Sequence, residues 1–168
     1  MTGPDPAWSG VGMWHVMLFY FLLAGSSAYA LWKGGAPERI AAVIILLATL
    51  FTLLVAPDKS WVFGSVHAGI FLVDLSMFVA LVALALHADR FWPLWMSAMQ
   101  GFGVFGHISV WLAPSIKPVV YAATHAIASY PILILLAFAT YRHLRRVSAN
   151  GADPSWAEPS YAPMRAGA

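Results

Sequence analysis

The sequence predicts an all-α integral membrane protein: a bundle of five transmembrane helices with its N-terminus outside and its C-terminus inside. The composition indicates this class, since 61% of the residues are hydrophobic and only 10% are charged. Ordinary soluble domains carry about 25% charged residues, so a chain this apolar cannot cover a surface that faces water. The length of its apolar runs also fits the thickness of a bilayer.

Five apolar runs are long enough to cross a membrane, which takes about 20 residues of helix. Turn-like or charged segments separate them, namely KGGAPER, PDKS, HADR and APSIKP. Asp89 is placed to cap the fourth helix, and Pro93 falls in its first turn, where a missing N–H costs little. The predicted spans are residues 11–32, 37–56, 62–86, 91–113 and 118–141.

Lysine and arginine gather on the cytoplasmic side of membrane proteins, and here they are distributed unevenly between the ends of the spans. With the N-terminus outside, the outer segments hold only Lys59 and Lys117. The inner segments hold Lys33, Arg39, Arg90, Arg142, Arg145, Arg146 and Arg165. The first cation follows the first apolar run, so we expect that run to be a retained helix and not a cleaved signal peptide.

This orientation divides the chain into an outer segment, residues 1–10, a transmembrane domain, residues 11–146, and an inner tail, residues 147–168. The tail is rich in Ala, Pro, Ser and Gly and has no periodicity, so we expect it to be disordered. The second helix carries almost no polar residue. We therefore expect it to face lipid at the periphery, while the other four helices form the core.

Three glycines in MQGFGVFGHIS, residues 99–109, spell the G-x-G-x-x-G of a dinucleotide-binding turn. That fingerprint requires a preceding strand and an acidic residue about 20 positions further on, and both are missing here. Gly103, Gly106 and His107 instead share one face of a membrane helix. Small residues on such a face allow another helix, or a flat macrocycle, to approach closely.

The most specific pattern is a layer of histidines, one on each of four helices. Counted inward from the outer helix ends, His15, His67, His107 and His125 lie about 6 to 11 Å deep. Neutral imidazole is a common metal ligand, and a haem held by two histidines needs one on each of two facing helices. These four residues are therefore candidate ligands for haem b or a metal ion, with Gly103 and Gly106 giving close approach.

A second polar set surrounds Asp74, which lies near the middle of the third helix, two turns from His67. On the fifth helix, Tyr121, His125 and Ser129 form a stripe at intervals of four residues. Ionisable residues inside a span are costly and point to function by default. Asp74, with Tyr121 and Ser129, is a candidate for proton or quinone handling.

Three interpretations of these residues remain open: a structural polar network, a haem or metal site, and proton or quinone handling. The chain has no cysteine and no hydrolase or phosphate-binding motif, which favours a role without catalysis. The net charge of +2, without a basic stripe, argues against nucleic acid. The leading prediction is a small accessory or structural subunit of a larger inner-membrane complex, for example an energy-transducing one, with other membrane subunits or further copies as partners in the lipid bilayer.

Three stretches, WKGGAPERIAA, HADRFWPLWMSAMQ and SYPILILLAFATYRH, resemble small polytopic proteins of the bacterial inner membrane. Together they cover about a quarter of the chain. The resemblance implies a multi-pass protein in that membrane, and it implies no activity and no site residues.

Overall fold

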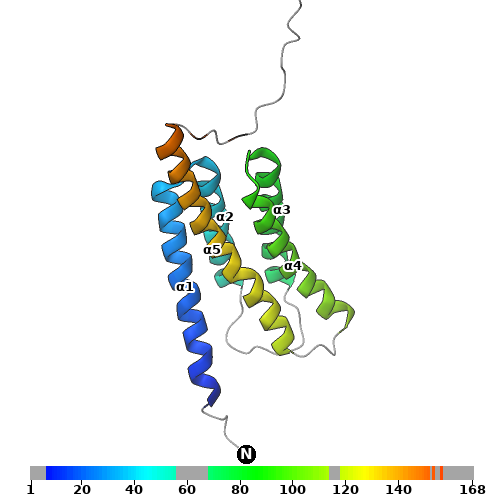
Figure 1. Ribbon diagram of the computed structural model, residues 1–168. Coiled ribbons are helices and arrows are strands. Elements are labelled where there is room, and N and C mark those ends of the chain that lie inside the picture. The colour runs from blue at the N-terminus through cyan, green and yellow to red at the C-terminus, as the bar shows by residue number, and fades with distance from the viewer. Residues whose placement is uncertain (1–6, 56–67, 114–117, 152, 154–155, 157–168) are drawn as a thin grey trace, which may run out of the picture.

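The computed structural model describes residues 7–55, 68–113, 118–151, 153 and 156, with side chains left out at 7–13 and 118–127. This part of the chain is all-α (Figure 1). Its five helices are α1 (Ala7–Lys33), α2 (Ala36–Val55), α3 (Ala68–His87), α4 (Trp92–Leu112) and α5 (Pro118–Asn150).

Within the described residues, three helices are long and apolar enough to cross a membrane: Trp14–Lys33, Ala36–Val55 and Ala68–His87. Many large apolar side chains on the helices point outward, among them Phe21, Leu54 and Leu86. Water would penalise such a surface, whereas lipid tails are as apolar as these side chains. The protein is therefore a membrane protein.

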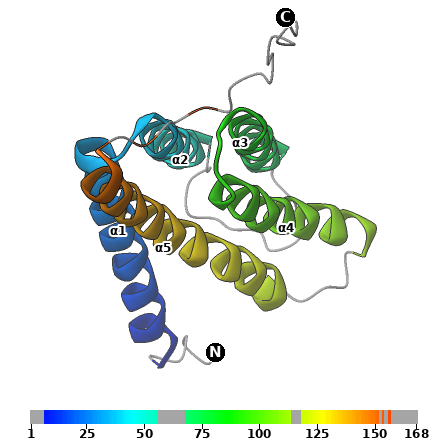
Figure 2. The ribbon, with the colours of Figure 1, turned by 45° about the horizontal axis from the view of Figure 1, so that its top comes forward.

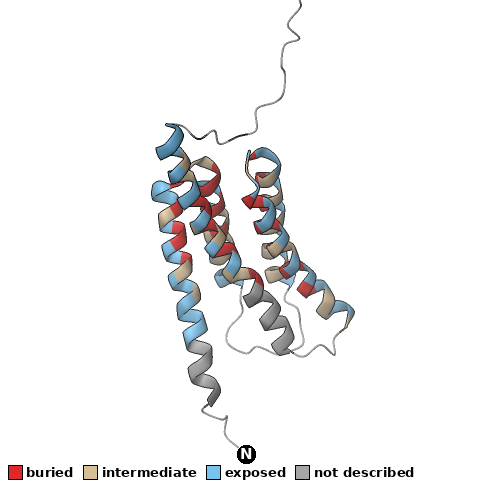
Figure 3. Ribbon diagram, in the orientation of Figure 1, coloured by how far each residue is buried: buried red, intermediate tan, exposed pale blue. Residues whose placement is uncertain are grey.

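The helices form a closed ring in chain order, because each packs against the next and α5 packs back against α1 (Figure 2). Buried positions follow the sides on which neighbouring helices meet (Figure 3). Leu81, Met96, Leu133 and Leu136 are fully buried. Small residues, such as Ala30 on α1, are buried in the same core and let the helices approach closely.

The prediction that the second helix takes no part in the core is wrong, because α2 contacts α1, α3 and α5 and buries Pro37, Glu38, Ala41, Ala42 and Ile45. The other residues of α2 are exposed or half-buried, in line with a helix that faces lipid on most sides. Counting polar residues did not reveal this packing, because in a membrane the lipid-facing and protein-facing sides of a helix are equally apolar.

The ends of α4 and α5 also differ from the sequence prediction. Pro93 does lie in the first turn of α4, but Phe91 takes the cap position and no side chain caps the helix, so Asp89 does not have the predicted role. Helix α5 continues from the predicted end at 141 to Asn150, because no helix-breaking residue intervenes. Gly151, with φ of 74°, then ends the helix, and its N–H donates to the Val147 carbonyl.

Candidate functional site

Asp74 on α3 and His107 on α4 form a polar pair inside the bundle. The Nε2 atom of His107 lies 2.8 Å from Oδ2 of Asp74. The Gln100 amide nitrogen donates to Oδ1 and to the backbone carbonyl of the same aspartate, both over 3.2 Å. His107 is fully buried, whereas Asp74 keeps 19% of its side chain exposed. The aspartate is thus the member of the group that remains accessible.

The sequence of α4 places these partners on one face of the helix. Gln100 and His107 are seven residues apart, which is two helical turns, and Gly103 lies between them. All three are buried. The ring of Phe71 packs edge-on against the imidazole, with centroids 5.7 Å apart. Helix geometry and aromatic packing together hold the His107 ring toward Asp74.

Beside this pair lies a cavity of about 230 Å³ to which all five helices contribute. Its polar side chains come from every helix: Tyr20, Thr49, Thr52, Asp74, Gln100 and Ser129. Its remaining wall is apolar and includes Phe19, Ile45 and Met77. A mostly apolar hollow with a few convergent polar groups is the usual form of a small-molecule site.

Several polar atoms of this wall are positioned to accept hydrogen bonds. Thr49 and Thr52 donate their hydroxyl hydrogens to the carbonyls of Ile45 and Ala48, each over 2.9 Å, which leaves oxygen lone pairs for an acceptor role. Because the Gln100 nitrogen donates to Asp74, the amide oxygen of Gln100 is the acceptor that this side chain offers a ligand. The cavity therefore suits a molecule that brings hydroxyl or N–H donors.

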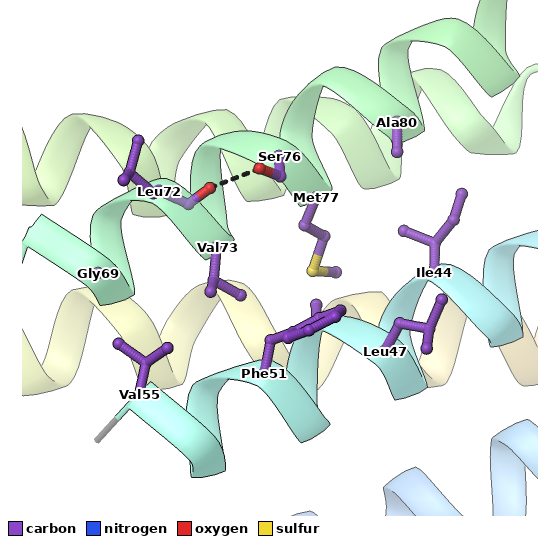
Figure 4. Close-up of a pocket in the computed structure, with 11 residues that line it drawn as sticks. Ile44, Leu47, Phe51, Val55, Gly69, Leu72, Val73, Ser76, Met77 and Ala80 are labelled. Carbon is purple, nitrogen blue, oxygen red and sulfur yellow. Dashed lines mark hydrogen bonds between the residues drawn. The ribbon is translucent and has the colours of Figure 1, made fainter. Parts of the chain in front are cut away.

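An apolar groove of about 490 Å³ lies on the other side of the contact between α2 and α3 (Figure 4). Ile44, Leu47, Phe51 and Val73 line it, and Ala48 and Met77 line both the groove and the cavity. In the part of its wall that the structure describes, the groove has one polar side chain, Ser76, and its hydroxyl donates to the Leu72 carbonyl over 2.7 Å.

The structure does not bring the predicted histidines together where it describes them. His15 is exposed, and His107 directs Nε2, a potential ligand atom, at Asp74. His67 lies outside the described residues, as does the side chain of His125. No group of three side chains that could hold a metal ion occurs among the residues the structure describes. A haem or metal ion therefore has no support from His15 and His107.

The predictions around Asp74 have mixed outcomes. Ser129 lines the same cavity as Asp74, while the side chain of Tyr121 is not among those described. Gly103 and Gly106 are buried within α4, as a close-packed face requires.

Asp74 is not the most deeply buried acid among the described residues. Glu38, in the first turn of α2, is 1% exposed, and neither of its carboxylate oxygens has a hydrogen-bond partner within the described part of the chain.

A second aspartate, Asp153, forms a charged cluster at the end of the bundle where α5 finishes. Its carboxylate accepts from His143 Nδ1 over 2.7 Å and from Arg146 Nε over 2.9 Å, and it pairs with Arg90 over 2.5 Å. Only 4% of its side chain is exposed. The segment after α5 is thereby attached to the connection between α3 and α4, where Trp156 also forms a backbone bridge with Ala88.

The charges around Asp153 fix its ionisation state. Burial by itself would raise the pKa of this carboxyl, but hydrogen bonds from His143 and Arg146 and the charge of Arg90 outweigh that effect and lower the pKa below its usual 3.8. Asp153 is therefore an anion at neutral pH, and it lies between the two permanent cations Arg90 and Arg146.

Sequence reasoning missed Gln100 and Asp153. The signal for Gln100 was available, since it lies two turns from His107 on the same face of α4. Asp153 had no such signal, because it lies beyond the end of α5 in a segment without periodicity. The predicted disorder of residues 147–168 does not hold for 147–150, which are helical, or for Asp153, which is held by three side chains.

No protein-family model, curated protein or solved structure matches this chain. The function must therefore be inferred from the geometry around Asp74 and Asp153.

Proposed function

We propose that this chain is a five-span protein of the bacterial inner membrane that binds a small amphiphile of the quinone or quinol type and carries a proton at the Asp74–His107 pair. The N-terminus lies outside and the C-terminus inside. The uneven distribution of lysine and arginine supports this orientation. One observation supports the function above all: the 2.8 Å contact between Asp74 and His107 borders a cavity lined by all five helices.

The pair can hold one or two exchangeable protons without moving its heavy atoms. A carboxylate beside a neutral imidazole carries a net charge of −1, and the Nε2 hydrogen then donates to Oδ2. One further proton makes the pair neutral, so the pair can receive a proton from a bound hydroxyl group and return it.

The ligand class follows from the atoms that face the cavity. The Gln100 amide oxygen and the threonine hydroxyls accept hydrogen bonds, and the remaining wall contacts hydrocarbon. A hydrocarbon ring with hydroxyl groups satisfies both kinds of surface. In this arrangement Asp74 exchanges a proton with the ring hydroxyl, Gln100 positions the ligand, and His107 orients Asp74 and shares its proton.

Equilibrium dialysis of a short-chain quinol analogue against the purified full chain in detergent tests this function. We expect Asp74→Asn and His107→Gln each to weaken binding about tenfold or more, since a hydrogen bond to a charged group contributes about 1.5–3 kcal/mol. Asp89→Asn and His87→Gln are matched controls, because both side chains are exposed, and we expect them to leave binding unchanged. Equal binding by wild type and Asp74→Asn would refute the proposal.

The accessory role that the sequence suggested remains a prediction. It concerns the outer surface of the bundle, and purification in mild detergent tests it directly. Stable co-purification of other membrane subunits would support the role, and a protein that always runs alone would count against it.

A further inference from the structure

The polar cavity and the apolar groove adjoin each other at two side chains. Ala48 on α2 and Met77 on α3 line both spaces. In Figure 4, Met77 extends from α3 into the space between the two helices, toward α2. The cavity and the groove thus share the methyl group of Ala48 and the thioether side chain of Met77 in their walls.

The two spaces differ sharply in polarity. The cavity has the Asp74 carboxylate, the Gln100 amide and the hydroxyl of Ser129 in its wall. Among the described residues that line the groove, Ser76 is the one polar side chain, and its hydroxyl is already bonded within its own helix. Together they provide a polar end and an apolar end, as in an amphiphile.

We propose that the cavity and the groove form one binding site for a head-and-tail amphiphile. The polar ring occupies the cavity, and its hydrocarbon tail passes between Ala48 and Met77 into the groove between α2 and α3. This inference rests on the proposed function, because the cavity must first bind the head. It adds the tail, its path and the side of the bundle from which the ligand enters.

The side chains at the junction suit such a passage. Methionine is unbranched with three rotatable bonds, so Met77 can turn aside without displacing the backbone. Alanine is the smallest side chain that could face it. The groove runs along α2 from Ile44 to Val55, which is about 16 Å of helix. At its far end, Val55 lies so close to Gly69 that no side chain fits between the helices.

The charge and burial of the two spaces favour a ligand tail over a bulk lipid chain as the occupant. A phospholipid headgroup would remain at the membrane surface, whereas the groove connects to polar atoms inside the bundle. A second copy of this chain could cover the groove only with an apolar helix face, which would leave Asp74 and Gln100 without a role.

Photoaffinity labelling of the full chain in nanodiscs tests the proposal. The probe is a quinol analogue with a diazirine in a saturated tail, and labelled peptides are identified by mass spectrometry. We expect labels on residues 44–55 and 69–80, and we expect an excess of the tail-less short-chain analogue to remove them. Ala80→Phe fills the groove without touching the cavity and should lower labelling about fivefold or more, while Val79→Phe, which is exposed on the same helix, should not.

Binding of the short-chain analogue separates the two proposals and reports on folding. If the short analogue binds wild type and Ala80→Phe equally, and only the tailed probe is affected by Ala80→Phe, both proposals hold. If the short analogue binds but the tail labels are scattered, or persist fully in Ala80→Phe, the tail path is wrong and the proposed function stands. If the short analogue does not bind wild type, the proposed function itself fails. Should Ala80→Phe not bind the short analogue, Leu47→Phe replaces it as the test variant, since Leu47 also lines the groove and not the cavity.

Discussion

Two aspartates of this protein accept a hydrogen bond from an imidazole, yet their surroundings are opposite. Asp74 lies 2.8 Å from His107 within the helix bundle, with the amide of Gln100 as a further donor. Asp153 lies 2.7 Å from His143 at the end of the bundle, between Arg90 and Arg146. The imidazole contacts are nearly equal in length, so distance alone does not distinguish the two sites.

The difference lies in the permanence of the neighbouring charges. Arginine stays protonated at every accessible pH, so Asp153 remains an anion whose charge is compensated. Two of the donors to Asp74 are an imidazole and an amide. The cluster around Asp153 acts as a fixed attachment, whereas the proposed function requires the pair around Asp74 to exchange a proton. Three substitutions and one change of pH test this contrast.

The largest expected effect is that of Asp74→Ala. It leaves the fully buried His107 and the buried Gln100 without the carboxylate they contact. Breaking a buried pair of this kind costs about 3 kcal/mol in free energy of unfolding, measured by denaturant titration in detergent. Asp74→Asn keeps an acceptor for His107 and should lose about 1 kcal/mol. Negligible losses in both variants would show that the Asp74 contacts do not stabilise the bundle.

Asp153→Ala should have a smaller and purely local effect. The contacts to Arg90, His143 and Arg146 hold the segment after Gly151 and not the helices themselves. We expect protease cleavage after Asn150 to accelerate about tenfold, which corresponds to about 1.4 kcal/mol of local opening, with little change in global unfolding. A large loss of global stability would mean that Asp153 supports the bundle, and the contrast with Asp74 would then disappear.

Gly35→Ala tests the same attachment from the opposite side. A Cβ atom at Gly35 would lie 2.8 Å from Cε1 of His143 and 3.0 Å from Oε2 of Glu38, closer than packed atoms allow. The imidazole must shift and so disturb its hydrogen bond with Asp153, which we expect to cost about 1 kcal/mol and to raise cleavage of the tail about threefold. Gly25→Ala is the matched control, since nothing lies within 4 Å of its added atom.

The smallest effect in the neutral range is that of pH on the Asp153 attachment. The pKa of Asp153 is lowered in the folded protein, so its contribution is complete above the unfolded value of 3.8 and is lost as pH falls through the folded pKa. Protection of the tail by Asp153 should therefore be constant from about pH 5 to 8 and weaken only below pH 3.8. Loss of the Asp153 contribution near about pH 6, where histidine titrates, would contradict this assignment, and the difference between wild type and Asp153→Asn measures it.

The sequence was sufficient for those features that depend on single residues or local pattern. Apolar runs and their separators predicted an all-α membrane chain, and the rarity of acids inside spans drew attention to Asp74. The face shared by Gly103 and His107 also followed from helical spacing. Each of these arguments uses only the period of one helix and the cost of burying one group.

Features that depend on helix rotation and neighbours could not be predicted in this way. The common depth of the histidines did not bring His15 and His107 together, because depth leaves the rotation of each helix open. The packing of α2 was hidden because lipid and protein surfaces are equally apolar. Asp153 was hidden because its partners, Arg90 and His143, come from other segments of the chain.

The proposed function depends most on one property: Asp74 and His107 share a proton that the site can gain and lose. Infrared difference spectroscopy of the full chain in lipid, recorded on binding of the short-chain quinol analogue in H₂O and D₂O, measures that property directly. We predict that carboxyl and imidazole bands change together on binding in wild type and that this coupled change is absent in both Asp74→Asn and His107→Gln, while Asp153→Asn retains it. A difference spectrum that is unchanged in Asp74→Asn would contradict the proposed proton site.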